Sequence, residues 1–183
     1  MNGLYTLASD VGASPRTLRR AVAQGTLRGT RRRNAVALPL SERQYVRRSW
    51  NLISAINGAL RTEHNVRLAI LFGSTATGQD VIGSDVDLLV SMRDDDLERV
   101  ADLEGKLEVI LGRRVDVVRA EDAERDPSFL GEAIDRGRVL VDRDGQLPRL
   151  SHSRRREASD RAIEIEAALA GIDRLIGRSR EDR

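Results

Sequence analysis

The stretch RLAILFGSTATGQDVIGSDVDLLV, from Arg67 to Val90, decides the fold of this chain. It contains an apolar run, a Gly-Ser turn, a polar loop, and a second apolar run whose first residues include Asp85 and Asp87. Short apolar runs bounded by turn residues are typical of buried strands. Alternate residues of a strand point to the same face, so we expect the two carboxylates to lie together. Like charges held this close repel each other unless a cation binds between them.

A turn that can bind phosphate lies next to this pair of acids. Hard divalent cations such as Mg²⁺ prefer carboxylate oxygens and bind together with phosphates. Gly73 and Ser74 follow the first apolar run directly, where free backbone N–H groups and a hydroxyl can bind phosphate oxygens. Phosphate on one side and a metal on the other predict a nucleotide site.

The spacing of these residues resembles that of a known family. Gly73-Ser74, a gap of ten residues and then Asp85-Val86-Asp87 match the pattern of the minimal nucleotidyltransferases, which belong to the polymerase-beta-like superfamily. That family also uses a third carboxylate from a later strand. Asp116, between two valines in RRVDVV, stands in such a setting. The resemblance covers residues 66 to 142.

The resemblance implies an α/β (α+β) fold with a small mixed β-sheet and flanking helices. It also implies a chemistry, nucleotidyl transfer, in which ATP is the expected substrate and AMP the group transferred. Two Mg²⁺ ions would be held by three catalytic carboxylates, of which Asp116 would help to deprotonate the acceptor hydroxyl. The implied metal ligands are Asp85, Asp87 and Asp116, and the implied nucleotide-binding residues are Gly73, Ser74 and Ser84.

The net charge of +2 conceals a strong segregation along the 183 residues. Residues 1–66 carry 11 arginines against 3 acids, a net charge of +8, whereas residues 67–145 carry 11 basic against 19 acidic residues, a net charge of −8. This asymmetry indicates a polyanion contact at the N-terminus and an acidic, metal-binding middle.

The chain has no cysteine, which excludes disulfides and thiolate chemistry. It also lacks an apolar run near the roughly 20 residues of a membrane span and a signal-peptide core, so we expect a cytoplasmic protein.

Residues 1–40 form the basic module. Two short helices are predicted around a turn, and the second starts at Ser14-Pro15, where the hydroxyl caps free N–H groups and proline tolerates the first helical position. This segment resembles the helix-turn-helix of excisionase-like and MerR-like DNA-binding domains, with Pro15 to Gln24 as the recognition helix and a short wing strand from Ala35 to Leu38. A small helical cap with solvated arginines is the alternative. The DNA-binding candidates are Arg16, Arg19, Arg20, Arg31, Arg32 and Arg33.

Residues 41–145 form the predicted transferase domain, and residues 146–183 a linker with a C-terminal amphipathic helix. A capping box at Ser41 and Gln44 predicts the start of a long helix. Asp94 to Asp96 are interpreted as the start of the helix that ends near Leu111. Residues 146–156 are expected to be a linker. The helix from about residue 153 to 176 has a heptad seam that could pack in cis, on a second copy or on another protein.

Small members of the resembled family are often paired with a HEPN ribonuclease toxin, which they silence by adding AMP to a tyrosine. The resemblance therefore implies an antitoxin with a toxin protein as its partner, and the basic module adds promoter DNA as a second partner. Other readings stay open: a transferase toxin that modifies tRNA, a DNA-binding repressor with a non-catalytic transferase fold, and an antibiotic-modifying transferase.

Overall fold

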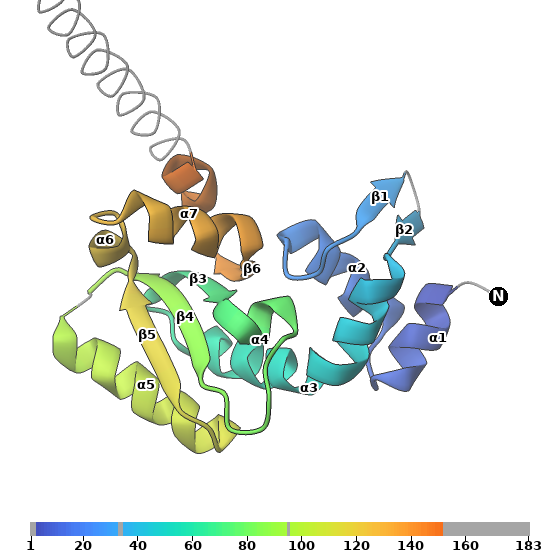
Figure 1. The fold of residues 1–183 in the computed structure, drawn as a ribbon, viewed down its shortest axis with the longest axis horizontal. Helices are drawn as coiled ribbons and strands as arrows, with labels where there is room; N and C mark the ends of the chain where they lie inside the picture. The colour runs from blue at the N-terminus through green and yellow to red at the C-terminus, as the bar shows by residue number, and fades with distance from the viewer. Residues whose placement is uncertain (1–2, 33–34, 95, 152–183) are drawn as a thin grey trace, which may run out of the picture. The chain divides into compact units, whose positions relative to one another are not determined.

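The computed structural model describes residues 3–32, 35–94 and 96–151 of the chain (Figure 1). The chain divides into two compact units, Met1–Leu147 and Pro148–Arg183. Residues 146–151 are helical, so the stretch expected to be a linker begins as a helix. The predicted C-terminal helix and Arg33 lie outside the described residues.

A four-stranded mixed sheet forms the centre of the first unit, as predicted. Its strand order is β5-β4-β3-β6, with β3 antiparallel to both of its neighbours and β4 parallel to β5. The parallel pair needs a crossover connection, which the helix between β4 and β5 supplies. The strands are β3 (Val66–Phe72), β4 (Val86–Met92), β5 (Val115–Arg119) and β6 (Arg138–Asp142), and the crossover helix is α5 (Leu97–Leu111).

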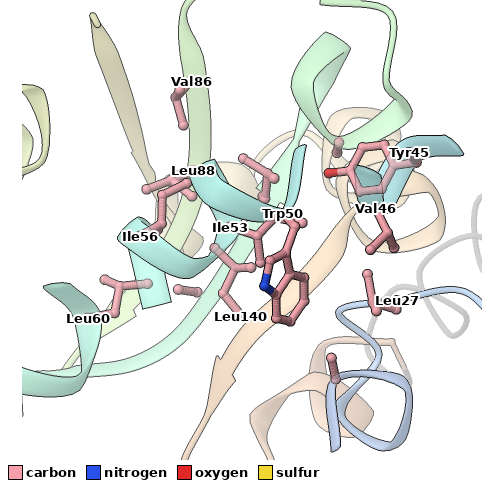
Figure 2. Close-up of a cluster of buried hydrophobic side chains, with 14 of the residues drawn as sticks. Leu27, Tyr45, Val46, Trp50, Ile53, Ile56, Leu60, Val86, Leu88 and Leu140 are labelled. Atoms are coloured by element: carbon pink, nitrogen blue, oxygen red, sulfur yellow. The ribbon is translucent and has the colours of Figure 1, made fainter. Parts of the chain in front are cut away.

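Helices cover the sheet, which is why β3 and β4 read as continuous apolar runs instead of alternating ones. The long helix α3 (Leu40–Thr62) contributes Trp50, Ile53 and Ile56 to a cluster that also holds Leu88 of β4 and Leu140 of β6 (Figure 2). Two short helices follow β5 in the chain, and the first packs against β4 and the second against β3. These are α6 (Ala120–Ala123) and α7 (Pro127–Arg136), and a further short helix, α4 (Gly73–Thr77), follows β3.

The N-terminal residues form two short helices and a hairpin. Ser14 caps the second helix by accepting a hydrogen bond from the Thr17 backbone N–H at 3.0 Å, and Gly25 ends it in the left-handed conformation (φ 83°). Leu27, which follows this helix, is buried in the same apolar cluster as Trp50 (Figure 2). Residues on both sides of the predicted boundary at residue 40 therefore share one core. The elements are α1 (Gly3–Asp10), α2 (Pro15–Gln24), β1 (Thr30–Arg32) and β2 (Ala35–Ala37).

The start of α3 differs from the prediction. The helix begins at Leu40 with Pro39 in the N-cap position, and no side chain caps it by a hydrogen bond. The capping box at Ser41 is therefore wrong. Glu42, in the first turn, is only 4% exposed and points inward to Arg138 of β6, with which it forms an ion pair. A buried guanidinium needs a counter-charge, so the ion pair with Arg138 orients the first turn of α3.

The start of α5 also lies later than predicted. The helix begins at Leu97, and Asp96 is its N-cap, accepting a hydrogen bond from the Arg99 backbone N–H at 2.8 Å. Asp94 lies before the helix, where its backbone pairs with the Asn65 side chain. Within residues 3–32, 35–94 and 96–151, no helix combines the length and apolar character needed to cross a bilayer.

Candidate active site

Strand register brings the predicted acids to neighbouring positions. Asp87 of β4 lies opposite Asp116 of β5 on one side and opposite Phe72 of β3 on the other. Asp85 immediately precedes β4, and Gly73 immediately follows Phe72. The structure therefore gathers these acids and the Gly-Ser turn at one edge of the sheet, the end at which β3 finishes and β4 and β5 begin.

The electrostatics of Asp87 reflect this crowding. Burial raises the pKa of Asp87 above its ordinary value, and the negative charges of Asp116 and Asp85 raise that pKa further. All three causes act against the ionised form, so the carboxylates repel one another in the protein alone. A bound cation would reverse this effect, because it favours the charged form of each acid.

The donor chemistry of these residues fits Mg²⁺. In the part of the chain that the structure describes, no three His, Cys, Asp or Glu side chains are grouped closely enough to hold a metal ion as they stand. The acids at this edge nevertheless offer only carboxylate oxygens, which are the ligands that Mg²⁺ prefers. Their mutual repulsion is a second reason to expect a divalent cation here.

Gly73 brings the backbone unusually close to this cluster. Its φ is +69°, and a Cβ atom placed on it would lie 2.2 Å from Oδ2 of Asp87. Any other residue would therefore strain the backbone and displace the carboxylate. Ser74, the second residue of α4, is half-buried beside it. The Gly-Ser turn is thus built around the position of Asp87.

Ser84 has a local structural contact. Its Oγ accepts a hydrogen bond from the Val81 backbone N–H at 2.9 Å, and its backbone N–H donates to the Val81 carbonyl at 3.0 Å. Its own carbonyl accepts from the guanidinium of Arg113. These bonds close a turn directly before Asp85, so a role of Ser84 in nucleotide binding stays a prediction.

Two arginines that the sequence did not single out hold this loop. Arg48 of α3 pairs with Asp80 at 2.9 Å, and Arg113 lies 3.7 Å from the same carboxylate. Their partners are 32 and 33 positions away in the chain, so no local pattern could have identified them. Together they anchor the loop that leads into the acids.

The predicted DNA-binding arginines fall in different surroundings. Arg16, Arg19, Arg20 and Arg31 line a surface hollow of about 490 Å³ between α2 and the hairpin. Arg19 is half-buried, and its guanidinium lies over the ring of Tyr5, 5.8 Å from the centroid. The backbone of Arg32 belongs to β1, and Arg33 lies outside the described residues.

Comparison with known proteins identifies the family. Residues 54–146, more than half of the chain, match the family described as polymerase beta, nucleotidyltransferase. The chain belongs to this family. The matched region contains the Gly-Ser turn and all of the acids at the sheet edge, and it confirms the nucleotidyltransferase predicted from the sequence. The comparison with curated proteins gives no match.

Solved structures of toxin–antitoxin complexes share the fold. A chain of a toxin–antitoxin complex with AMP-PNP is 22% identical with a TM-score of 0.51, over 66% of this chain and 97% of that one. A chain of a mutant of the toxin–antitoxin pair MntA–HpeT is 20% identical with a TM-score of 0.53. The match covers 66% of this chain and 97% of that one. A chain of the complex between the tri-AMPylated HEPN toxin of Shewanella oneidensis and an MNT antitoxin is 20% identical with a TM-score of 0.50. The match covers 68% of this chain and 98% of that one. These likenesses support the resemblance to minimal nucleotidyltransferases at the level of fold.

Replacing Gly73 by alanine tests the built geometry of this site. We expect Gly73→Ala to weaken Mg²⁺-dependent binding of AMP-PNP by about tenfold or more, because the new Cβ displaces Asp87. Isothermal titration calorimetry measures the affinity. Gly112→Ala is the matched control, since Gly112 has a similar φ of +61° with nothing within 4 Å of its Cβ position. Equal affinities for the two variants would contradict this account of Gly73.

Proposed function

We propose that this protein is a Mg²⁺-dependent nucleotidyltransferase that transfers AMP from ATP to a hydroxyl group of a partner protein. The observation that carries the proposal is the meeting of Asp85, Asp87 and Asp116 beside the tight turn at Gly73. Membership of the nucleotidyltransferase family supports it.

The chain's own residues have distinct roles in the proposed reaction. Gly73 and Ser74 bind the β- and γ-phosphates, which fixes the α-phosphate in front of the acids. The acceptor oxygen forms a bond to the α-phosphorus as the bond to pyrophosphate breaks, and pyrophosphate leaves with that electron pair. Asp116, on the exposed end of the cluster, helps to take the hydroxyl proton. Two Mg²⁺ ions held by Asp85, Asp87 and Asp116 would neutralise charge on the phosphates.

We propose that the acceptor is a toxin protein and that this chain is its antitoxin. The structures that share its fold come from toxin–antitoxin complexes, one with AMP-PNP and one with an AMPylated HEPN toxin. The charge of residues 67–145 supports a protein acceptor over tRNA, because this segment has a net charge of −8 and repels RNA phosphates. The turn before Asp85 also exposes Val81 and Ile82, which suit an apolar protein surface.

Removing the acids tests the chemistry. The double change Asp85→Asn, Asp87→Asn should lower transfer of label from α-labelled ATP at least about 100-fold, because charge stabilisation at the phosphates is lost. The assay contains MgCl₂ and the product of the neighbouring gene, with tRNA offered separately. Asp102→Asn, on the exposed face of α5, is the control. Activity retained in the double variant removes both residues from the mechanism, and label on tRNA alone favours the toxin reading.

Changing the exposed turn tests the protein acceptor. Ile82→Asp should slow transfer to the partner protein about tenfold or more, because a charge replaces an apolar contact at the interface, while the affinity for AMP-PNP stays unchanged. Val109→Asp, at another exposed apolar position, on α5, should leave transfer unaffected. If Ile82→Asp transfers AMP at the wild-type rate, the partner docks elsewhere.

We also propose that the N-terminal module binds DNA, with the hollow between α2 and the hairpin as the contact surface. Arg16 and Arg20 are exposed there, and their guanidinium groups suit DNA phosphates. Such binding would let the protein regulate its own promoter.

Salt dependence tests the DNA contact. Arg16→Ala with Arg20→Ala should weaken binding to the upstream DNA and reduce the slope of log K against log salt by about 2, one for each lost phosphate contact. Fluorescence anisotropy over a salt series measures both quantities. The pair Arg93→Ala and Arg99→Ala, exposed near the start of α5, is the control. A slope that the first pair leaves unchanged argues against this surface.

A further inference from the structure

Arg138 is buried at the start of β6 with all three of its side-chain nitrogens hydrogen-bonded. It is 2% exposed, and its Nη1 and Nη2 donate to the two carboxylate oxygens of Glu42 at 2.5 and 3.1 Å. Nη1 also donates to the Thr26 carbonyl at 3.1 Å, and Nε to the Ala76 carbonyl at 2.6 Å. The guanidinium lies over the ring of Tyr45, 3.4 Å from its centroid. One side chain thus joins β6, α3, α4 and the N-terminal module.

Tyr45 holds the neighbouring carbonyl of α4. Its hydroxyl donates to the Thr75 carbonyl at 3.2 Å, and burial raises the pKa of Tyr45, so the phenol keeps its proton. The Thr75 hydroxyl in turn donates to the backbone carbonyl of Asp85 at 3.1 Å. Successive carbonyls of α4 are therefore fixed by Tyr45 and Arg138, and α4 is fixed to the residue that precedes β4.

The N-terminal module completes this network. Glu42 Oε1 accepts a hydrogen bond from the Arg28 backbone N–H at 2.9 Å. The Thr26 hydroxyl donates to the Val139 carbonyl of β6 at 2.6 Å. Thr26 and Arg28 follow α2, the helix that carries Arg16, Arg19 and Arg20. One buried ion pair therefore joins this helix to the Gly-Ser turn.

We propose that Arg138, Glu42 and Tyr45 are positioning residues that set α4, and with it Gly73 and Ser74, for nucleotide binding. The N-terminal module is then a working part of the transferase, because its backbone helps to orient the ion pair. This inference rests on the proposed role of Gly73 and Ser74 in binding phosphates. None of the three positioning residues touches the nucleotide in this scheme, so they act through the backbone of α4.

Tyr45→Phe in the full-length protein tests the proposal. The change removes one hydroxyl and keeps the ring under Arg138. We expect the KM for ATP and the Kd for AMP-PNP with Mg²⁺ to rise about fivefold, the effect of one net hydrogen bond, while kcat stays within about twofold because binding is lost uniformly. Tyr5→Phe, at the other tyrosine of the chain, which is 54% exposed, is the matched control.

The readouts separate this inference from its alternatives. If Tyr45 has a purely structural role, Tyr45→Phe lowers the melting temperature or the fraction of active protein, and with it the apparent kcat, but leaves KM and Kd unchanged. That result would overturn the proposal. If the wild-type protein binds AMP-PNP but transfers no AMP, the proposed reaction is overturned. The effect of Tyr45→Phe on the Kd for AMP-PNP then still tests the positioning role. A wild-type protein that binds no nucleotide would overturn both.

Arg138→Lys gives a second, stronger test. Lysine keeps the charge but lacks the planar fork that reaches Glu42, Thr26 and Ala76 together, so the Kd for AMP-PNP should rise more than in Tyr45→Phe. Arg136→Lys, on an exposed side chain at the end of α7, is its control. If Arg138→Lys does not fold, Tyr45→Phe still decides the question.

Discussion

The buried pair of Arg138 and Glu42 is the constraint on which the arrangement of this protein depends. Taking both charges out of water costs several kcal/mol for each ion. The attraction between them offsets that cost only if further hydrogen bonds satisfy the buried groups, and here the carbonyls of Ala76 and Thr26 each accept one more guanidinium hydrogen. Such a pair adds little net stability compared with an apolar core. Its hydrogen bonds hold β6, α3 and α4 to one another, because the guanidinium of Arg138 contacts Glu42 of α3 and the Ala76 carbonyl of α4.

The acids at the sheet edge show the opposite electrostatic design. Around Arg138, charges of both signs are matched within the protein. Around Asp87, burial and two neighbouring carboxylates all raise its pKa, so each acts against its ionised form. This repulsion lowers the stability of the protein alone, and it favours binding of a cation and the phosphates that accompany it. The fold can hold these acids together because they lie at the start of β4 and β5, and β4 is anchored by its buried residues Val86, Leu88, Leu89 and Val90.

Sequence reasoning succeeded where the relevant geometry is local. The apolar run that follows the two acids was enough to predict that Asp85 and Asp87 lie at the start of a strand, and another local pattern predicted the cap at Ser14. That the two carboxylates share one face stays a prediction. It failed at the start of α3, where the capping box predicted at Ser41 and Gln44 spans Glu42, whose partner Arg138 lies 96 positions away. Arg138 was likewise not singled out from the sequence. A charged residue next to an apolar run resembles a surface residue unless the tertiary partner is known.

The residues that hold α4 extend beyond the region of the family match. The matched region, residues 54–146, contains Gly73, the acids and Arg138, but it excludes Glu42 and Tyr45. The helix α4 has only five residues, too few to be stable alone, so its geometry must come from its surroundings. Part of those surroundings lies before residue 54 in this chain, at Glu42, Tyr45 and the backbone of Thr26. The position of α4 therefore depends on residues of α3 that precede the matched region, and the backbone of Thr26 and Arg28 joins the N-terminal module to the same ion pair.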